Sequence, residues 1–152
     1  MAESVSGRSE TEIRDEGLVG NSVGMAVTAV SNGNKTLVQF LLTKGADVNA
    51  QGGKYENALQ AAINVNNEAI VHLLLTHGAE VNTQGGFYGN ALQAAAYMGN
   101  EAIVELLLTH GADVNTLGGE YGNALKAAEY MQNNEIVQLH LTSGTHGAGG
   151  VL

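Results

Sequence analysis

A pattern of 33 residues repeats along this chain and constrains its fold more than any other feature. Four copies follow one another without a gap from Leu18 to Gly149. The middle two copies are nearly identical, whereas the outer two have diverged. A repeat of this length is one supersecondary unit that cannot bury its apolar side alone, so neighbouring units must stack. The sequence therefore predicts a solenoid of four units, at residues 18–50, 51–83, 84–116 and 117–149.

Each unit has the pattern of a loop followed by two short helices, as the third unit illustrates. Asn90 is a favourable N-cap for a first helix, and Gln93 three residues later fits a capping box. That helix is rich in alanine, whose small side chain lets helices approach closely. Gly99 is placed to end it, and Asn100 begins a second helix that carries larger aliphatic residues. Neither helix is long enough to be stable alone, which predicts an all-α stack.

The segment "ALQAAAYMGNEAIVELLLTHGADVN" (residues 91–115) resembles an ankyrin repeat, and its second half follows the family pattern closely. The Thr-Pro-Leu-His opening of the family is replaced here by Asn-Ala-Leu-Gln. The Gly-Gly-x-Tyr loop resembles that of fungal-type ankyrin arrays, which often form the C-terminal part of larger nucleotide-binding signalling proteins. The resemblance implies an all-α ankyrin-repeat solenoid of four stacked helix-turn-helix units with projecting hairpin-like loops. It also implies a non-catalytic module, without a cofactor, that binds a partner protein on its concave side.

The glycine-rich loops, such as "GGFYGN" at residues 85–90, raise the alternative of a phosphate-binding site. A P-loop requires Lys followed by Ser or Thr at the start of the helix. Asparagine stands there instead, at Asn57, Asn90 and Asn123. We therefore interpret the glycines as turn residues and predict no cofactor-binding residue.

The five histidines raise the alternative of a metal or hydrolase site. The chain has no cysteine, and no Ser-His-Asp or paired-carboxylate spacing stands out. His77 and His110 fill one repeat position, just before a glycine that ends the second helix, where a cation complements the helix dipole. His140 replaces a leucine of the other units, which we interpret as a relaxed terminal face. We predict no catalytic and no metal-binding residue; a cryptic hydrolase or metal site is the enzyme-class alternative.

The formal charge of −9 argues against nucleic acid and against an anionic membrane as partners. No apolar run is long enough to span a membrane, and the N-terminus lacks the core of a signal peptide. We expect an intracellular protein, most simply a cytoplasmic one, with the nucleus left open and no small-molecule substrate.

Residues 1–17 are polar and acidic, which predicts disorder. The glycine-rich end, up to residue 152, fits either a worn C-terminal cap or a fragment of a longer array.

Positions that vary within the repeat framework are candidates for recognition. By analogy with the ankyrin family, the loop tips and the ends of the first helices lie on the concave side. The aromatic and Met side chains there have the composition of interface hot spots and are expected to act as anchors, while two charged loop tips set polarity. The predicted partner-binding residues are Lys54, Phe87 and Glu120 at the loop tips and Asn64, Tyr97, Met98, Tyr130 and Met131 at the helix ends.

A structural role is the alternative for these tyrosines and methionines, because Tyr55, Tyr88 and Tyr121 in the loops offer partners to pack on. If Tyr97 and Met98 are exposed anchors, changing both to alanine should abolish partner capture and leave melting nearly intact. For the whole chain, a further alternative is an accessory fragment of a larger nucleotide-binding signalling protein. An upstream nucleotide-binding domain in the same reading frame would favour that interpretation.

Overall fold

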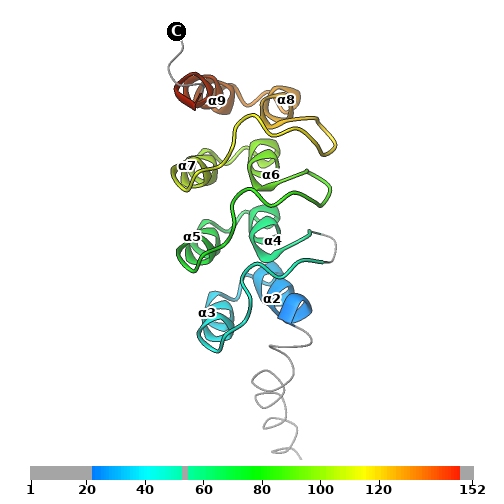
Figure 1. Ribbon diagram of the computed structural model, residues 1–152, viewed down its shortest axis with the longest axis vertical. Helices are drawn as coiled ribbons and strands as arrows, with labels where there is room; N and C mark the ends of the chain where they lie inside the picture. The colour runs from blue at the N-terminus through cyan, green and yellow to red at the C-terminus, as the bar shows by residue number, and fades with distance from the viewer. Residues whose placement is uncertain (1–21, 53–54, 148–152) are drawn as a thin grey trace, which may run out of the picture.

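The described part of the chain consists of eight α-helices in four pairs (Figure 1). The computed structural model describes residues 22–52 and 55–147; for residues 22–26, and for residues 140–147 other than Thr142, it describes the backbone alone. The helices are α2 (Ser22–Ser31), α3 (Lys35–Thr43), α4 (Ala58–Asn64), α5 (Glu68–Thr76), α6 (Ala91–Met98), α7 (Glu101–Thr109), α8 (Ala124–Tyr130) and α9 (Asn134–Gly147).

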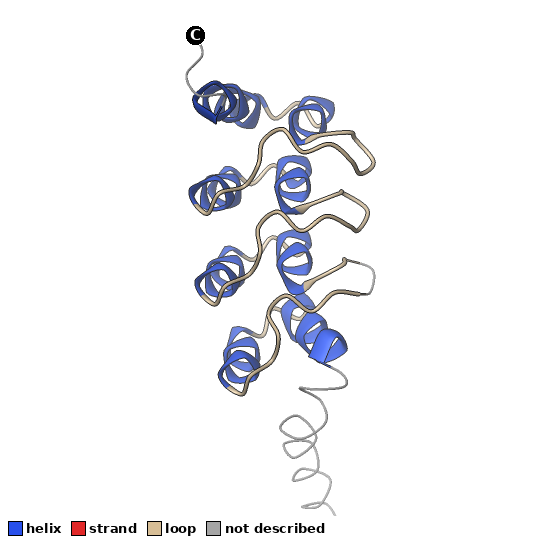
Figure 2. Ribbon diagram, in the orientation of Figure 1, coloured by secondary structure: helices blue, strands red, loops and turns tan. Residues whose placement is uncertain are grey.

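The helices stack in two columns, with α2, α4, α6 and α8 in one and α3, α5, α7 and α9 in the other (Figures 1 and 2). Long loops connect one pair to the next and project beside the first column. Each pair falls within one predicted 33-residue unit, so the all-α solenoid expected from the repeat is confirmed. We call the surface formed by the projecting loops and the C-terminal ends of α4, α6 and α8 the inner face.

Alanine and larger aliphatic side chains form the hydrophobic core between the two columns of helices. Ala94, Ala95 and Ala96 of α6 are fully buried, as are Ile103 and Leu107 of α7. The alanines let the first-column helices approach closely, and the longer aliphatic side chains of the second column fill the space behind them. No helix in the described ranges is both long and apolar enough to cross a membrane.

Asparagine caps the helices of both columns. In the third unit the Asn90 side chain accepts a hydrogen bond from the Gln93 amide at 2.8 Å, and Asn100 caps α7 in the same way at 3.0 Å. Gly99 ends α6 in the left-handed conformation, with φ 76°. These boundaries agree with the sequence-based expectation, and they repeat in the neighbouring units because the asparagines recur every 33 residues.

The expected capping box is wrong in its second half. The side chain of Gln93 does not return to the amide of Asn90; its Nε2 donates to the Thr116 carbonyl at 3.4 Å, and its Oε1 is buried without a hydrogen-bond partner. The reason is burial, because Gln93 lies within the stack between α6 and the following loop rather than at a solvent-exposed helix start.

The projecting loops are hairpin-like, as the resemblance implied. Isolated antiparallel bridges join Gly85 to Gly89 and Gly118 to Gly122. Gly119 has φ 72°, and a Cβ added there would collide with the carbonyl group of Tyr88 in the preceding loop. The glycines therefore act as turn residues and also let successive loops stack backbone against backbone.

Asparagines also link successive units on the side away from the inner face. The Asn82 side chain donates to the Gly111 carbonyl at 3.0 Å and accepts from the Asp113 amide at 2.8 Å. Asn49 makes the same two bonds one unit earlier, to Gly78 and Glu80. Both polar atoms of each amide are satisfied across a junction, which fixes the register of one unit on the next.

The last helix, α9, continues to Gly147, past the point where the second helices of the preceding units end. In α5 and α7 the helix stops before Gly78 and Gly111, and a valine beyond each turn is buried. In the last unit a glycine, Gly147, stands at the repeat position of that valine. The predictions for residues 1–17, for the tail after Gly147 and for the side chain of His140 lie outside the described residues.

Candidate functional site

Five aromatic rings form a continuous series on the inner face. The ring centroids of successive neighbours are 5.0 Å apart for Phe87 and Tyr88, 5.1 Å for Tyr88 and Tyr97, 5.2 Å for Tyr97 and Tyr121, and 5.0 Å for Tyr121 and Tyr130. Tyr97 and Tyr121 are nearly parallel, with 23° between the ring planes. We call these five residues the aromatic ladder. Such contacts contribute beyond simple area burial, which makes the ladder part of the fold as well as part of the surface.

The ladder follows directly from the repeat. One tyrosine stands in each loop, at Tyr88 and Tyr121, and another ends the first helix of the same unit, at Tyr97 and Tyr130. Stacking places the helix tyrosine of one unit between its own loop tyrosine and that of the next unit. The interpretation that loop tyrosines pack against the helix-end tyrosines is therefore confirmed.

The environment of the ladder changes the acidity of its central phenols. Burial among its neighbours, the hydrogen bond with Tyr97, and the charges of Tyr97, Tyr130 and Glu120 raise the pKa of Tyr121 to about 12. Burial, followed by the charges of Tyr97 and Tyr55, raises the pKa of Tyr88. Both shifts favour the neutral form of the two loop phenols, Tyr88 and Tyr121.

The predicted anchors divide into two groups by exposure. Phe87 is 57% exposed, Tyr130 68% and Met131 40%, and these three large apolar side chains face solvent. Tyr97 and Met98 are instead half-buried and pack against the core, so the expectation that they are exposed is wrong. Tyr97 lies between two other rings, and its loss would disturb the stack itself.

The polar candidates are distributed around the same face. Glu120 is exposed, and its backbone amide donates to the Phe87 carbonyl at 3.1 Å, which joins the tips of two successive loops. Asn64 is half-buried at the end of α4. Lys54 lies outside the described residues. The structure therefore places seven of the eight predicted residues on the inner face.

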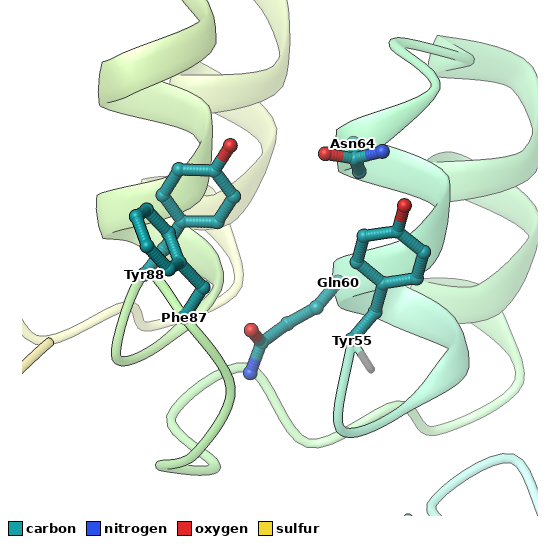
Figure 3. A pocket seen from close by; sticks show the side chains of 5 residues that line it. All are labelled: Tyr55, Gln60, Asn64, Phe87 and Tyr88. Atoms are coloured by element: carbon teal, nitrogen blue, oxygen red, sulfur yellow. The ribbon is translucent and has the colours of Figure 1, made fainter. Parts of the chain in front are cut away.

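A pocket of about 280 Å³ opens on the inner face between the second and third units (Figure 3). The ring of Tyr55 stands on one side, and those of Phe87 and Tyr88 stand on the other. Asn64 and Gln60 of α4 complete the lining, and the side chain of Gln60 reaches into the space between the two loops. Gln60 is only 3% exposed, and its Nε2 is buried without a hydrogen-bond partner.

His77 and His110 lie at the C-terminal ends of α5 and α7, and each ring contacts a backbone carbonyl of its own helix. Nδ1 of His77 lies 2.9 Å from the Leu73 carbonyl oxygen, and Nδ1 of His110 lies 2.9 Å from that of Leu106. Within the described ranges, no group of three His, Asp or Glu side chains is placed to hold a metal ion.

Three features of this face were not found from the sequence. The pocket depends on side chains from two units, and no single-unit motif marks it. The unpartnered amide of Gln60 depends on packing geometry. The third feature is Leu117, which is 72% exposed. The sequence indicates it only by the leucine that replaces the glutamine of the two preceding units at this position.

The stacked helix pairs and hairpin-like loops define an ankyrin-type solenoid. A family model described as Ankyrin repeats (3 copies) matches residues 26–118, and the chain belongs to the ankyrin repeat family. A search of curated proteins gave no match. Ankyrin repeats are in general protein–protein interaction modules.

Proposed function

We propose that the chain binds a partner protein through its inner face, with Phe87, Tyr130 and Met131 as the anchors. The observation that carries the proposal is the exposure of these three large apolar side chains on one continuous surface. Isolated exposed apolar residues are ordinary, but a cluster of aromatic and Met side chains has the composition of an interface centre. Phe87 and Tyr130 each contact one ring of the ladder, and more than half of each side chain remains exposed and available to a partner.

The half-buried candidates have a supporting role in this proposal. Tyr97 and Met98 hold the ladder and the end of α6 in place, which keeps the exposed rings in fixed positions. Rigid aromatic anchors lose little conformational entropy on binding. Glu120 and Asn64 lie beside the anchors and provide polar contacts at the edge of the surface.

Charge indicates the chemistry of the partner. The chain carries a formal charge of −9, and Glu120 and Glu129 are exposed on or next to the inner face. A neutral or basic protein surface fits this potential, whereas nucleic acid and anionic lipid would be repelled. The proposal is a binding function without a catalytic step, a cofactor or a metal.

The test compares the capture of partner proteins from the source cells by two purified variants. In Tyr130→Ala/Met131→Ala both exposed anchors of the fourth unit are removed; Glu105→Ala, exposed on the outer helix α7, is the matched surface control. We expect the double variant to lose the specifically captured protein while melting within a few degrees of the wild type. The control should capture normally. Unchanged capture by the double variant would refute the inner face as the binding surface.

A further inference from the structure

The pocket occupies a particular place in the aromatic series. Asn64 stands at the repeat position that Tyr97 and Tyr130 fill in the next two units. In the third unit the Tyr97 ring lies between Tyr88 and Tyr121, at centroid distances of 5.1 Å and 5.2 Å. One unit earlier the corresponding loop tyrosines are Tyr55 and Tyr88, and both line the pocket together with Asn64. The pocket is therefore the space of one missing ring.

Its size agrees with that origin. The pocket measures about 280 Å³, and an engineered protein cavity of about 150 Å³ is large enough to bind benzene. Drug-sized ligands usually occupy sites of roughly 300–1,000 Å³. The pocket thus has room for one aromatic side chain and the atoms that carry it, at the lower limit for a free ligand.

The chain itself does not provide this ring. Of its seven aromatic residues, six already line the inner face, and the seventh, Phe40, belongs to α3, where the Lys44 ammonium lies 5.6 Å from its centroid. The segments that the structure does not describe, residues 1–21, 53–54 and 148–152, contain no Phe, Tyr or Trp. A ring that enters the pocket would therefore come from outside residues 1–152.

We propose that the partner protein inserts one aromatic side chain between Tyr55 and Tyr88, in the place that Tyr97 occupies in the next unit. This inference rests on the proposed function and specifies what the inner face recognises. The flanking rings favour a planar side chain, because aromatic neighbours interact best through offset or tilted faces. The amide of Gln60 turns easily about its last torsion, so its unpartnered N–H can meet an acceptor on the entering segment.

The decisive variant is Asn64→Tyr, which supplies from the chain the ring that the partner would otherwise supply. The structure gives the Asn64 side chain no hydrogen bond within the described residues, so the substitution removes no such bond there. Val65→Tyr is the matched control, because it adds the same side chain at the next residue, which is exposed and does not line the pocket.

Phage-displayed random peptides are the probe. Selection on the wild type should enrich peptides with Phe, Tyr or Trp at one fixed position, and changing that residue to alanine should weaken binding about tenfold or more. Asn64→Tyr should weaken the same peptides to a similar extent while raising the melting temperature by a few degrees, because its own ring completes the ladder. Val65→Tyr should bind within about twofold of the wild type, since a stacked pair contributes only where its geometry is met.

Several results would overturn the inference. One is the enrichment of aliphatic or basic residues at the fixed position of the peptides. Another is that Asn64→Tyr binds the selected peptides as tightly as the wild type does. Equally tight binding of free N-acetyltyrosinamide would indicate a small molecule as occupant, and self-association that Asn64→Tyr abolishes would indicate a second copy. If Tyr130→Ala/Met131→Ala loses partner capture and Asn64→Tyr does not, the proposed function stands and the pocket assignment fails. If neither variant loses capture, the proposed function itself fails.

Discussion

Two junctions between units are stabilised on opposite sides of the solenoid. One joins the second unit to the third, and the other joins the third unit to the fourth. At the earlier junction the outer side is joined by both hydrogen bonds of Asn82, but the inner side has a pocket beside Asn64. At the later junction the inner side is filled by Tyr97. The outer side there shows no equivalent bonds from Asn115 within the described residues, because α9 runs on through the position of the turn.

The projecting loops of the third and fourth units also differ in how tightly each packs on the preceding loop. Gly86 and Gly119 are equivalent residues with nearly equal φ, 74° and 72°. A Cβ on Gly119 would meet the backbone of Tyr88, whereas a Cβ on Gly86 would meet the movable end of Gln60 at 2.9 Å and the Tyr55 carbonyl oxygen only at 3.5 Å. The same repeated loop thus occurs with both a closed and an open inner side.

The largest expected effect comes from Gly119→Ala, which breaks the closed junction. The variant combines a positive φ with a collision against backbone that cannot move aside, so we expect a loss of about 3 kcal/mol or more in the free energy of unfolding. Gly86→Ala has the same backbone strain but displaces only a flexible side chain, and should lose about 1 kcal/mol. Urea unfolding of both variants measures the difference; equal losses would show that the two loops are packed alike.

Tyr97→Asn should convert the closed junction into a second open one. We expect a loss of about 2 kcal/mol in the free energy of unfolding, because a half-buried ring with two aromatic neighbours is removed. The variant should also gain a second site for aromatic peptides, which isothermal titration calorimetry would record as a doubled stoichiometry. Tyr97→Phe keeps the ring but loses the hydrogen bond to Tyr121, so it should keep the wild-type stoichiometry and lose less stability than the asparagine variant. An unchanged stoichiometry in the asparagine variant would mean that a missing ring alone does not make a binding pocket.

Asn82→Ala, on the outer side of the open junction, should lose less stability than Gly119→Ala or Tyr97→Asn. Two cross-unit hydrogen bonds are lost at an exposed position, so the free energy of unfolding should fall by about 1–2 kcal/mol. Asn115→Ala is its repeat equivalent and should be nearly neutral. Comparison of the two by thermal melting tests whether the outer asparagine compensates for the open inner side; identical melting temperatures would argue that it does not.

The sequence predicts the repeating elements well because their causes are local. The position of Asn90 before α6, the left-handed Gly99 and the buried alanines follow from backbone requirements that recur every 33 residues. The family pattern adds the stacking of the units. These features need no knowledge of which side chains meet across a junction.

What the sequence did not predict depends on contacts between units. Tyr97 was expected to be exposed, but a loop tyrosine from the next unit covers one side of its ring. Gln93 was expected to complete a local capping box, but its side-chain amide donates to the carbonyl of Thr116 instead. Thr116 is the last residue of the third unit, next to the fourth. The pocket beside Asn64 forms only when two units are stacked. The sequence indicates it, through asparagine in place of tyrosine, only after the aromatic ladder has been described.

The concentration of rings on the inner face has an optical consequence. The chain contains no tryptophan, and all five of its tyrosines line this surface. Its near-ultraviolet absorption and its intrinsic fluorescence therefore originate almost entirely where a partner would dock, without any label. A phenol or indole that settles between Tyr55 and Tyr88 would quench or redirect that emission directly, and any tryptophan emission from a complex would belong to the bound molecule.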